Sequence, residues 1–96
     1  MLVLITYDVS TVDVAGRRRL RRVARLCVDY GQRVQNSVFE CELTPAQFVE
    51  LKAALQKEID PVADSLRLYR LGAQGRSKVE HIGAKPVLDL EGPLIF

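Results

Sequence analysis

LVLITYDV, residues 2–9, is the stretch that decides the fold of this 96-residue chain. It is an almost unbroken run of β-prone residues, which is typical of a central strand covered on both faces. Successive side chains of a strand point to opposite faces. Here both sets are largely apolar: Val3, Ile5, Tyr7 and Val9 on one face, and Leu2, Leu4, Thr6 and Asp8 on the other. We therefore expect helices over one face of the sheet and a further layer over the other.

A basic helix is predicted to follow this strand. Turn and capping residues fill positions 10–16 and Gly31 supplies a stop, so the helix is expected to begin near 14–16 and to end at about Tyr30. Its apolar stripe consists of Leu20, Val23, Ala24, Cys27 and Tyr30. The opposite face collects Arg18, Arg21, Arg22 and Arg25, while the stripe is flanked by Arg17 and Arg19. We expect a helix with a buried back and a basic outer face.

The middle of the chain predicts further strands and a second helix. Residues 33–43 have strand character that Asn36 and Ser37 interrupt, which predicts two short strands or one kinked strand. The sequence TPAQ at 44–47 has the pattern of a capping box with proline at the first helical position, so a helix begins there and Asp60-Pro61 closes it. Its core face consists of Phe48, Leu51, Leu55 and Ile59.

Two more strands are predicted near the C-terminus. Residues 65–71 alternate as a strand, with Leu66 and Leu68 on the face expected to be buried and Arg67 and Tyr69 on the other. After a loop at 72–77, residues 78–82 predict another short strand. The apolar tail PLIF then requires cover from another part of the protein or from a partner.

The order of these elements predicts an α+β fold. Strand, helix, split strand, helix and strand suit an antiparallel sheet with both helices on one face, the split βαβ arrangement. We expect one domain over residues 1–96, with 84–96 as a C-terminal extension. A chain of this length buries limited apolar surface by itself. Because the second face of the sheet is apolar, we expect a homodimer that packs sheet to sheet.

Composition excludes several classes of protein. Apolar residues make up 48% of the chain and aromatic residues 6%, which indicates an aliphatic core rather than a disordered or disulfide-stapled chain. No run approaches the roughly 18 apolar residues that span a bilayer, and no basic leader is visible, so we expect a cytoplasmic protein with no membrane partner. The net charge is only +2, but the positive charge is local, so an anionic partner is expected to dock on the arginine helix.

Asp8 is the candidate catalytic carboxylate. It ends the apolar strand, where a charge is costly unless a cation, a donor or solvent compensates it. One interpretation is that it caps the following loop by accepting bonds from the amides of Ser10 and Thr11. The other is that two copies meet across a two-fold axis and share one hydrated Mg²⁺, because a single carboxylate gives this ion little grip. That ion would polarise a phosphodiester and activate water for in-line attack.

The arginine face also has two interpretations. No acidic residue lies between Arg17 and Arg25, so the positive potential is not cancelled within the helix, and the arginine fork suits phosphate oxygens. The alternative is a solvated face whose arginines pair with acidic residues elsewhere in the fold. Arg33, Gln35 and Ser37 alternate along the next segment and form either a polar face for a nucleic-acid backbone or an ordinary strand edge.

The other residues of chemical interest are interpreted as structural. Cys27 and Cys41 lack the short spacing of metal sites and are expected to be two buried thiols. His81 has no serine or cysteine poised next to it in the sequence. Gly72, Gly75 and Gly83 do not follow the strand-to-helix pattern of a phosphate-binding loop, so no nucleotide cofactor is predicted.

Five segments, in order, resemble the CRISPR-associated Cas2 family. They are TYDVS at 6–10, GRRRLRRVARL at 16–26, YGQRVQNSVFECEL at 30–43, LRLYRLG at 66–72 and PLIF at 93–96. The run RVQNSVFEC at 33–41 is the specific element. The resemblance covers nearly the whole chain.

The resemblance implies a fold and an activity. The implied fold is a ferredoxin-like βαββαβ sandwich in a homodimer, with an extra C-terminal strand that pairs with the sheet of the partner subunit. The implied activity is that of a metal-dependent endonuclease on RNA or double-stranded DNA, and a role with the Cas1 integrase in spacer acquisition. Carried over by position, the metal ligand is Asp8, and Tyr7 joins it as a second candidate catalytic residue. Arg33 belongs to the site or its nucleic-acid contact, and Ser37 and Phe39 support the site. Because the loop at 9–16 is long, the family's basic positions are not assigned among Arg17, Arg19 and Arg22.

Three functions compete at this point. The leading one is a Mg²⁺-dependent endonuclease, with Asp8 from both chains holding the ion and the arginine helix holding the nucleic acid. The second is a non-catalytic architectural dimer that binds duplex DNA and bridges integrase subunits, for which Asp8→Asn preserves DNA binding and spacer acquisition. The third is a small-molecule-binding regulatory dimer of similar topology, which leaves the arginine face unexplained.

Overall fold

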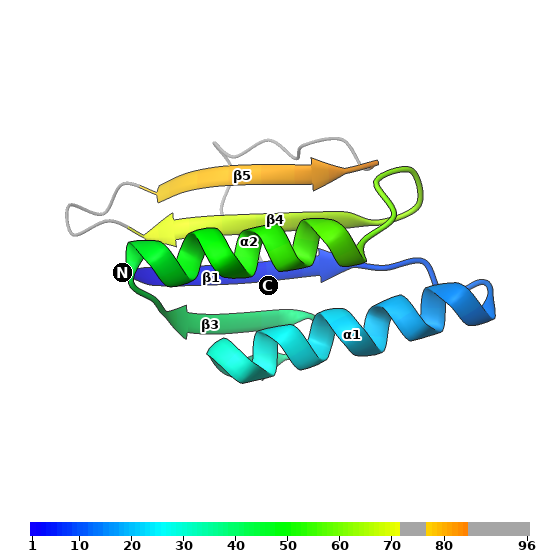
Figure 1. Cartoon of the computed structure of the whole chain (residues 1–96), viewed down its shortest axis with the longest axis horizontal. Helices are drawn as coiled ribbons and strands as arrows, with labels where there is room; N and C mark the ends of the chain where they lie inside the picture. The colour runs from blue at the N-terminus through cyan, green and yellow to red at the C-terminus, as the bar shows by residue number, and fades with distance from the viewer. Residues whose placement is uncertain (72–76, 85–96) are drawn as a thin grey trace.

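The computed structural model describes residues 1–71 and 77–84 and has an α+β fold (Figure 1). Its elements are β1 (Leu2–Asp8), α1 (Val14–Tyr30), β2 (Gln32–Gln35), β3 (Val38–Glu42), α2 (Pro45–Glu58), β4 (Ser65–Leu71) and β5 (Ser77–Gly83). The strands form one sheet in the order β2-β3-β1-β4-β5, and every neighbouring pair is antiparallel. The predicted ferredoxin-like arrangement is confirmed, and β5 adds a fifth strand that pairs with β4 of the same chain.

The core lies between the sheet and the two helices, which both cover the same face (Figure 1). On β1 this face carries Val3, Ile5 and Tyr7, which are almost completely buried. The strand register places Cys41 and Phe39 of β3 beside Val3 and Ile5 on this face. On β4 the same face carries Leu66 and Leu68, which are buried as predicted.

The opposite face of the sheet is covered by neither α1 nor α2, the two helices of the described residues (Figure 1). Its β1 residues Leu2, Leu4 and Thr6 are half-buried, and Asp8 is exposed. The register places Tyr69 opposite Leu4 and Arg67 opposite Thr6, so both lie on this face, as predicted. We call this surface the helix-free face.

Helix α1 has the predicted buried stripe and is capped at its start by Asp13. The carboxylate of Asp13 accepts a hydrogen bond of 2.7 Å from the amide of Gly16. Gly16 is buried, and a Cβ at this position would collide with the carbonyl oxygen of Ser10. The helix therefore packs closely against the loop that follows β1, which only a glycine permits here.

Helix α2 begins with the capping box predicted at residues 44–47. The amide of Gln47 donates to the Thr44 hydroxyl at 3.1 Å, and the amide of Thr44 donates to the Gln47 side chain at 2.9 Å. Its core face is confirmed, because Phe48, Leu51 and Leu55 are buried. In the described part of the chain, neither helix is long and apolar enough to cross a membrane.

The structure decides between the alternatives for residues 33–43. Two strands form there, β2 and β3, and the register shifts between Arg33 and Gln35. β5 begins at Ser77, which the sequence places in the preceding loop, and ends at Gly83. The rest of that loop and residues 85–96, with the tail PLIF and nearly all of the expected extension at 84–96, lie outside the described residues.

The two cysteines are buried free thiols, as predicted. Burial raises the pKa of Cys27 to about 12, and the nearby Cys41 adds to this shift. Burial also raises the pKa of Cys41 to about 11, with a further contribution from Glu40. Both groups therefore stay protonated and poorly nucleophilic at neutral pH.

Asp64 carries a buried carboxylate that the sequence reasoning missed. Its side chain is fully buried and accepts hydrogen bonds from the amides of Ser10 (3.0 Å) and Asp60 (2.9 Å) and from Nε of Arg19 (2.9 Å). Burial by itself raises the pKa of a carboxyl group, but the hydrogen bonds from Arg19, Asp60 and Ser10 outweigh it and hold the pKa of Asp64 below its ordinary value of 3.8. One carboxylate thus joins the loop after β1, helix α1 and the connection from α2 to β4.

We predict that Asp64→Asn lowers the free energy of unfolding at pH 7 by about 3 kcal/mol, because asparagine keeps only one acceptor oxygen, turns an NH₂ group toward the donors of the other oxygen and leaves the Arg19 charge without its counter-charge. The pKa of Asp64 is lower in the folded than in the unfolded protein. The ionised carboxylate therefore contributes its full stabilisation of the fold above about pH 4, and this contribution is lost as the pH falls through the pKa of the folded protein. Urea denaturation at several pH values measures both effects.

The matched control is Asp29→Asn, the same change at an exposed position of α1. It should leave the free energy of unfolding within about 0.5 kcal/mol of the wild type. A variant at Asp64 with wild-type stability and an unchanged acid profile would contradict the role assigned to this carboxylate.

Candidate functional site

Asp8, the predicted metal ligand, is the last residue of β1. Its side chain is exposed and lies on the helix-free face, opposite Ser65 at the start of β4. Ser10, whose amide the sequence reasoning offered as a donor to Asp8, instead donates to Asp64. The carboxylate of Asp8 therefore stands at an open strand end where a solvated ion has access to it.

One chain offers a divalent cation only part of a site. Within residues 1–71 and 77–84, no group of three or more histidine, cysteine, aspartate or glutamate side chains is placed to hold a metal ion. Asp8 nevertheless supplies the hard carboxylate oxygens that Mg²⁺ prefers, and this ion commonly takes one or two carboxylates and fills its other positions with water or phosphate. The residues present therefore fit Mg²⁺ as one half of a shared site.

Tyr7 lies on the other face of β1, in an aromatic cluster at the tip of the β2–β3 hairpin. Its ring stacks on Phe39 with 6.0 Å between the ring centroids, and the Arg33 guanidinium lies 5.1 Å from the centroid of Phe39. The Tyr7 hydroxyl donates to the carbonyl oxygen of Asn36 at 3.4 Å, and the Tyr7 amide donates to the carbonyl oxygen of Ser37 at 3.2 Å. Ser37 thus contacts Tyr7 through its backbone.

The cluster determines the acidity of Tyr7. Burial raises the pKa of the Tyr7 hydroxyl above its ordinary value of 10.0, and Cys27 adds to the shift. Arg33 lowers the pKa through its charge and a hydrogen bond, but it does not cancel the effect of burial. At neutral pH Tyr7 is therefore a neutral donor rather than a base.

The structure separates the residues that the family resemblance groups together. It gathers Tyr7, Arg33 and Phe39 on the helix side of the sheet, while Asp8 lies on the helix-free face. Adjacent residues of one strand must diverge in this way. Ser37, in the turn before β3, joins the cluster through its backbone. We therefore treat Tyr7 and its neighbours as support for the end of β1, and not as direct partners of Asp8.

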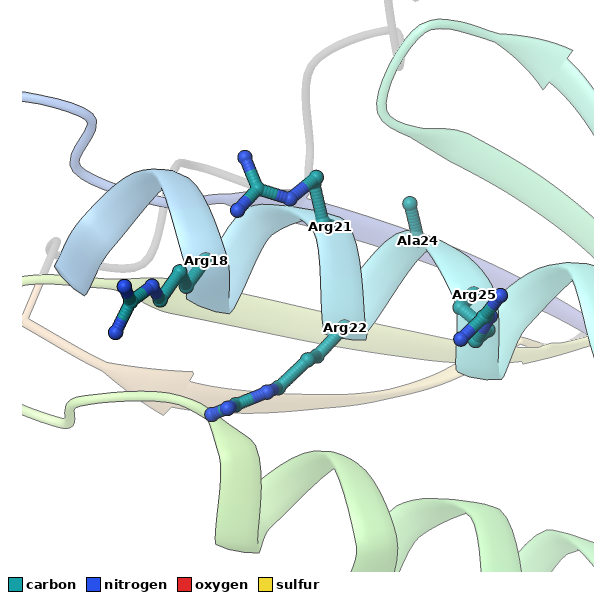
Figure 2. A pocket seen from close by; sticks show the side chains of 5 residues that line it. All are labelled: Arg18, Arg21, Arg22, Ala24 and Arg25. Atoms are coloured by element: carbon teal, nitrogen blue, oxygen red, sulfur yellow. The ribbon is translucent and has the colours of Figure 1, made fainter. Parts of the chain in front are cut away.

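Four of the predicted arginines surround an open hollow on the outer side of α1 (Figure 2). The hollow has a volume of about 630 Å³, and within the described part of the chain its lining consists of Arg18, Arg21, Arg22, Ala24 and Arg25. All five residues come from the helix, and the four arginines recur at the helical spacing that places them on one face. We call this surface the arginine face.

Two of the predicted arginines have acidic partners elsewhere in the fold. Arg19 forms the buried ion pair with Asp64, so its fork is engaged inside the protein. Arg22 extends toward α2, and its guanidinium lies 3.8 Å from Glu58, a long contact between partly exposed groups that contributes little (Figure 2). Arg17 is exposed and donates to the carbonyl oxygen of Thr11 at 3.4 Å. The alternative interpretation, in which the arginines pair with acidic residues elsewhere in the fold, is therefore correct for Arg19.

His81 lies on β5, opposite Arg67 on the helix-free face. Its Nδ1 accepts a hydrogen bond of 3.1 Å from Nε of Arg67, and Arg67 also donates to the Tyr69 hydroxyl at 3.5 Å. This places the His81 proton on Nε2 when the ring is neutral. The contacts agree with the structural role that was expected for His81.

The family model and the curated relatives that match this chain all belong to one family. The family described as CRISPR associated protein Cas2 matches residues 1–79. A curated relative from Rhodospirillum rubrum, named CRISPR-associated endoribonuclease Cas2 3, is 63% identical over 95 residues, which are 99% of this chain and 100% of the relative. A relative from Halalkalibacterium halodurans, named CRISPR-associated endonuclease Cas2, is 62% identical over the full length of both chains.

A solved structure has the same fold. The crystal structure of Streptococcus pyogenes Cas2 at pH 6.5 superposes with a TM-score of 0.70 and is 65% identical in sequence. The match covers 75% of this chain and 87% of that chain.

We predict that the Tyr7 hydroxyl titrates above pH 10, and that Arg33→Gln raises its pKa further because the guanidinium now lowers it. The near-ultraviolet absorbance of tyrosinate, taken as the difference between each protein and its Tyr7→Phe counterpart, measures this pKa. Arg18→Gln removes the same charge from the arginine face and should leave the Tyr7 pKa unchanged. A Tyr7 pKa that falls in Arg33→Gln would contradict the assignment.

Proposed function

Because this chain belongs to the family of CRISPR associated protein Cas2, we propose that it is a metal-dependent endonuclease of a CRISPR system. Its substrates are phosphodiester bonds of RNA or double-stranded DNA, and it acts with the Cas1 integrase in spacer acquisition. The names of its relatives as endoribonuclease and endonuclease support this activity. The protein is proposed to work in the cytoplasm, where its two buried thiols stay reduced.

The exposed carboxylate of Asp8 at the end of β1 is the observation that carries this proposal. Two copies of Asp8, brought together in a homodimer, are proposed to hold one Mg²⁺ between them. When bound, the ion supplies Lewis-acid polarisation of a phosphodiester and a water of lowered pKa. Asp8 itself contributes negative charge and fixes the place of that chemistry at the subunit interface.

The helix-free face is the proposed dimer surface. Leu2, Leu4 and Thr6 are half-buried there, and this apolar strip runs along β1 to Asp8. If a second copy packs on this strip, the two-fold axis brings equivalent residues close to each other. The same packing that covers the apolar strip thereby places the two carboxylates near one another, so dimerisation and metal binding support each other.

The arginine face is the proposed contact for the nucleic-acid backbone. Four arginine side chains of α1 line one hollow and are exposed to solvent. Asp64 engages Arg19, which lies outside this set, and Glu58 makes only a long, partly exposed contact of 3.8 Å with Arg22. Arginine binds phosphate oxygens through a planar fork, and each neutralised phosphate releases counterions. Binding is therefore expected to be insensitive to sequence and sensitive to salt.

We predict that Asp8→Asn lowers Mg²⁺-dependent cleavage of RNA or duplex DNA by at least about 100-fold, because both carboxylates that hold the ion, one from each subunit, are lost. Cleavage is measured with purified protein in Mg²⁺ and in EDTA. Asp29→Asn, which removes the same charge from an exposed position of α1, should cleave like the wild type.

Two outcomes of this experiment count against the nuclease. Equal traces of cleavage in every variant and in EDTA indicate a contaminating enzyme. Wild-type protein that binds DNA and supports spacer acquisition without cleaving, together with an Asp8→Asn variant that does the same, favours the architectural dimer. The arginine face supports that second function equally well, because it lies on α1 and does not include Asp8.

We predict that replacing Arg18, Arg21 and Arg25 together by glutamine weakens duplex binding by at least about tenfold at about 0.1 M salt, with a smaller dependence on salt by about one unit of slope for each lost phosphate contact. Fluorescence anisotropy across a salt series measures both quantities. Lys57→Gln, at an exposed position of α2, is the control and should change neither. Unchanged affinity in the triple variant would remove the arginine face from the binding surface.

A further inference from the structure

The geometry points to Asp64 and Arg19 as positioning residues for the Asp8 carboxylate, an inference that rests on the function proposed above. Asp64 is fully buried and the Arg19 fork is engaged with it, so neither group is available to touch the substrate. Their role is instead to hold the chain on both sides of Asp8 in one conformation.

The Asp64 carboxylate uses both of its oxygens. Oδ1 accepts from the amide of Ser10 at 3.0 Å and from Nη2 of Arg19 at 3.3 Å. Oδ2 accepts from Nε of Arg19 and from the amide of Asp60, both at 2.9 Å. Four donors thus surround one buried carboxylate, and the bidentate arginine fixes its plane as well as its charge.

These contacts reach Asp8 by two short routes. Along the chain, Ser10 is two residues after Asp8, in the loop that follows the end of β1. Across the sheet, Asp64 directly precedes Ser65, which is the register partner of Asp8. The end of β1 and the start of β4 are therefore both attached to the same carboxylate.

The end of β5 is attached to the same point. The amide of Ala84 donates to the carbonyl oxygen of Asp64 at 2.9 Å. Gly83 has a φ of 124°, and a Cβ at this position would collide with that carbonyl oxygen and with Cα of Ser65. Only glycine allows β5 to approach so closely, so three neighbouring strands converge on Asp64 beside Asp8.

The position of the β1 end matters for a metal site that two subunits share across a two-fold axis. Any displacement of the β1 end is doubled, because the partner subunit moves by the symmetric amount. Residues that orient a ligand from behind typically change metal affinity by about 10- to 100-fold when they are lost. We therefore expect the Asp64–Arg19 pair to set the affinity for Mg²⁺ without setting the affinity for nucleic acid.

Hydrogen exchange of the wild-type protein is the first test. The Ser10 amide lies outside β1, yet its bond to Asp64 should make it exchange at least about tenfold more slowly than the exposed Thr11 and Val12 amides that follow it. In Arg19→Lys, which keeps the charge but loses the fork, this protection should fall while the protection of α2 is retained. Equal exchange at Ser10, Thr11 and Val12 in the wild type would overturn the proposal, whether or not the protein cleaves.

Metal dependence is the second test. In Asp64→Asn and Arg19→Lys, the Mg²⁺ concentration for half-maximal cleavage should rise by about tenfold, and calorimetric titration with Mg²⁺ alone should show the same weakening. Affinity for nucleic acid in EDTA should stay at the wild-type value, as should every quantity in Asp29→Asn. Arg19→Lys keeps this test decisive if Asp64→Asn does not fold.

The two tests separate the failure of this inference from that of the function. A folded variant with unchanged Mg²⁺ affinity and unchanged half-maximal concentration overturns the positioning role and leaves the nuclease intact. A wild type that neither binds Mg²⁺ nor cleaves overturns the nuclease and the metal-positioning role together, while protection at Ser10 still reports whether the pair holds the strand end.

Discussion

A buried carboxylate has to be neutralised where it lies, and in this fold that constraint organises the end of the central strand, where Asp8 lies. Asp64 has no access to solvent, so its charge depends on the Arg19 fork and on two backbone amides. The donors come from the loop after β1, from α1 and from the connection that follows α2. Satisfying one charge therefore fixes where three segments meet, and this meeting point lies beside the only exposed residue of β1.

The same pair also explains why the arginines of α1 fall into two groups. Arg19 flanks the buried stripe of the helix, next to Val23, and turns inward to Asp64. Arg18, Arg21 and Arg25 lie on the far side and face solvent around the hollow. A helix whose apolar stripe and one flanking arginine are both engaged cannot rotate about its axis, so the outward direction of the remaining arginines is fixed as well.

The local elements could be predicted from the sequence because each one is encoded by neighbouring residues. The capping box at Thr44 and Gln47, the stop at Gly31 and the alternation along β1 are all signals of this kind. Asp64 could not be found in this way, because its partners Ser10 and Arg19 are 54 and 45 residues away along the chain. The separation of Tyr7 from Asp8 was implicit in the alternation of a strand, but the family resemblance obscured it by grouping the two residues in one site.

The arginine face and the Asp8 end of the helix-free face carry opposite charges, and this difference determines how a nucleic acid would interact with each. The arginine face attracts phosphates on the helix side, while the helix-free face presents a carboxylate that repels them unless a cation intervenes. Under the proposed function, a divalent ion at Asp8 would convert the repulsive end of β1 into an attractive one for a nucleic acid bound to the arginine face. Because the loop from Asp8 to α1 is held at Ser10 by the same carboxylate that holds Arg19, the two surfaces keep a fixed relation to each other.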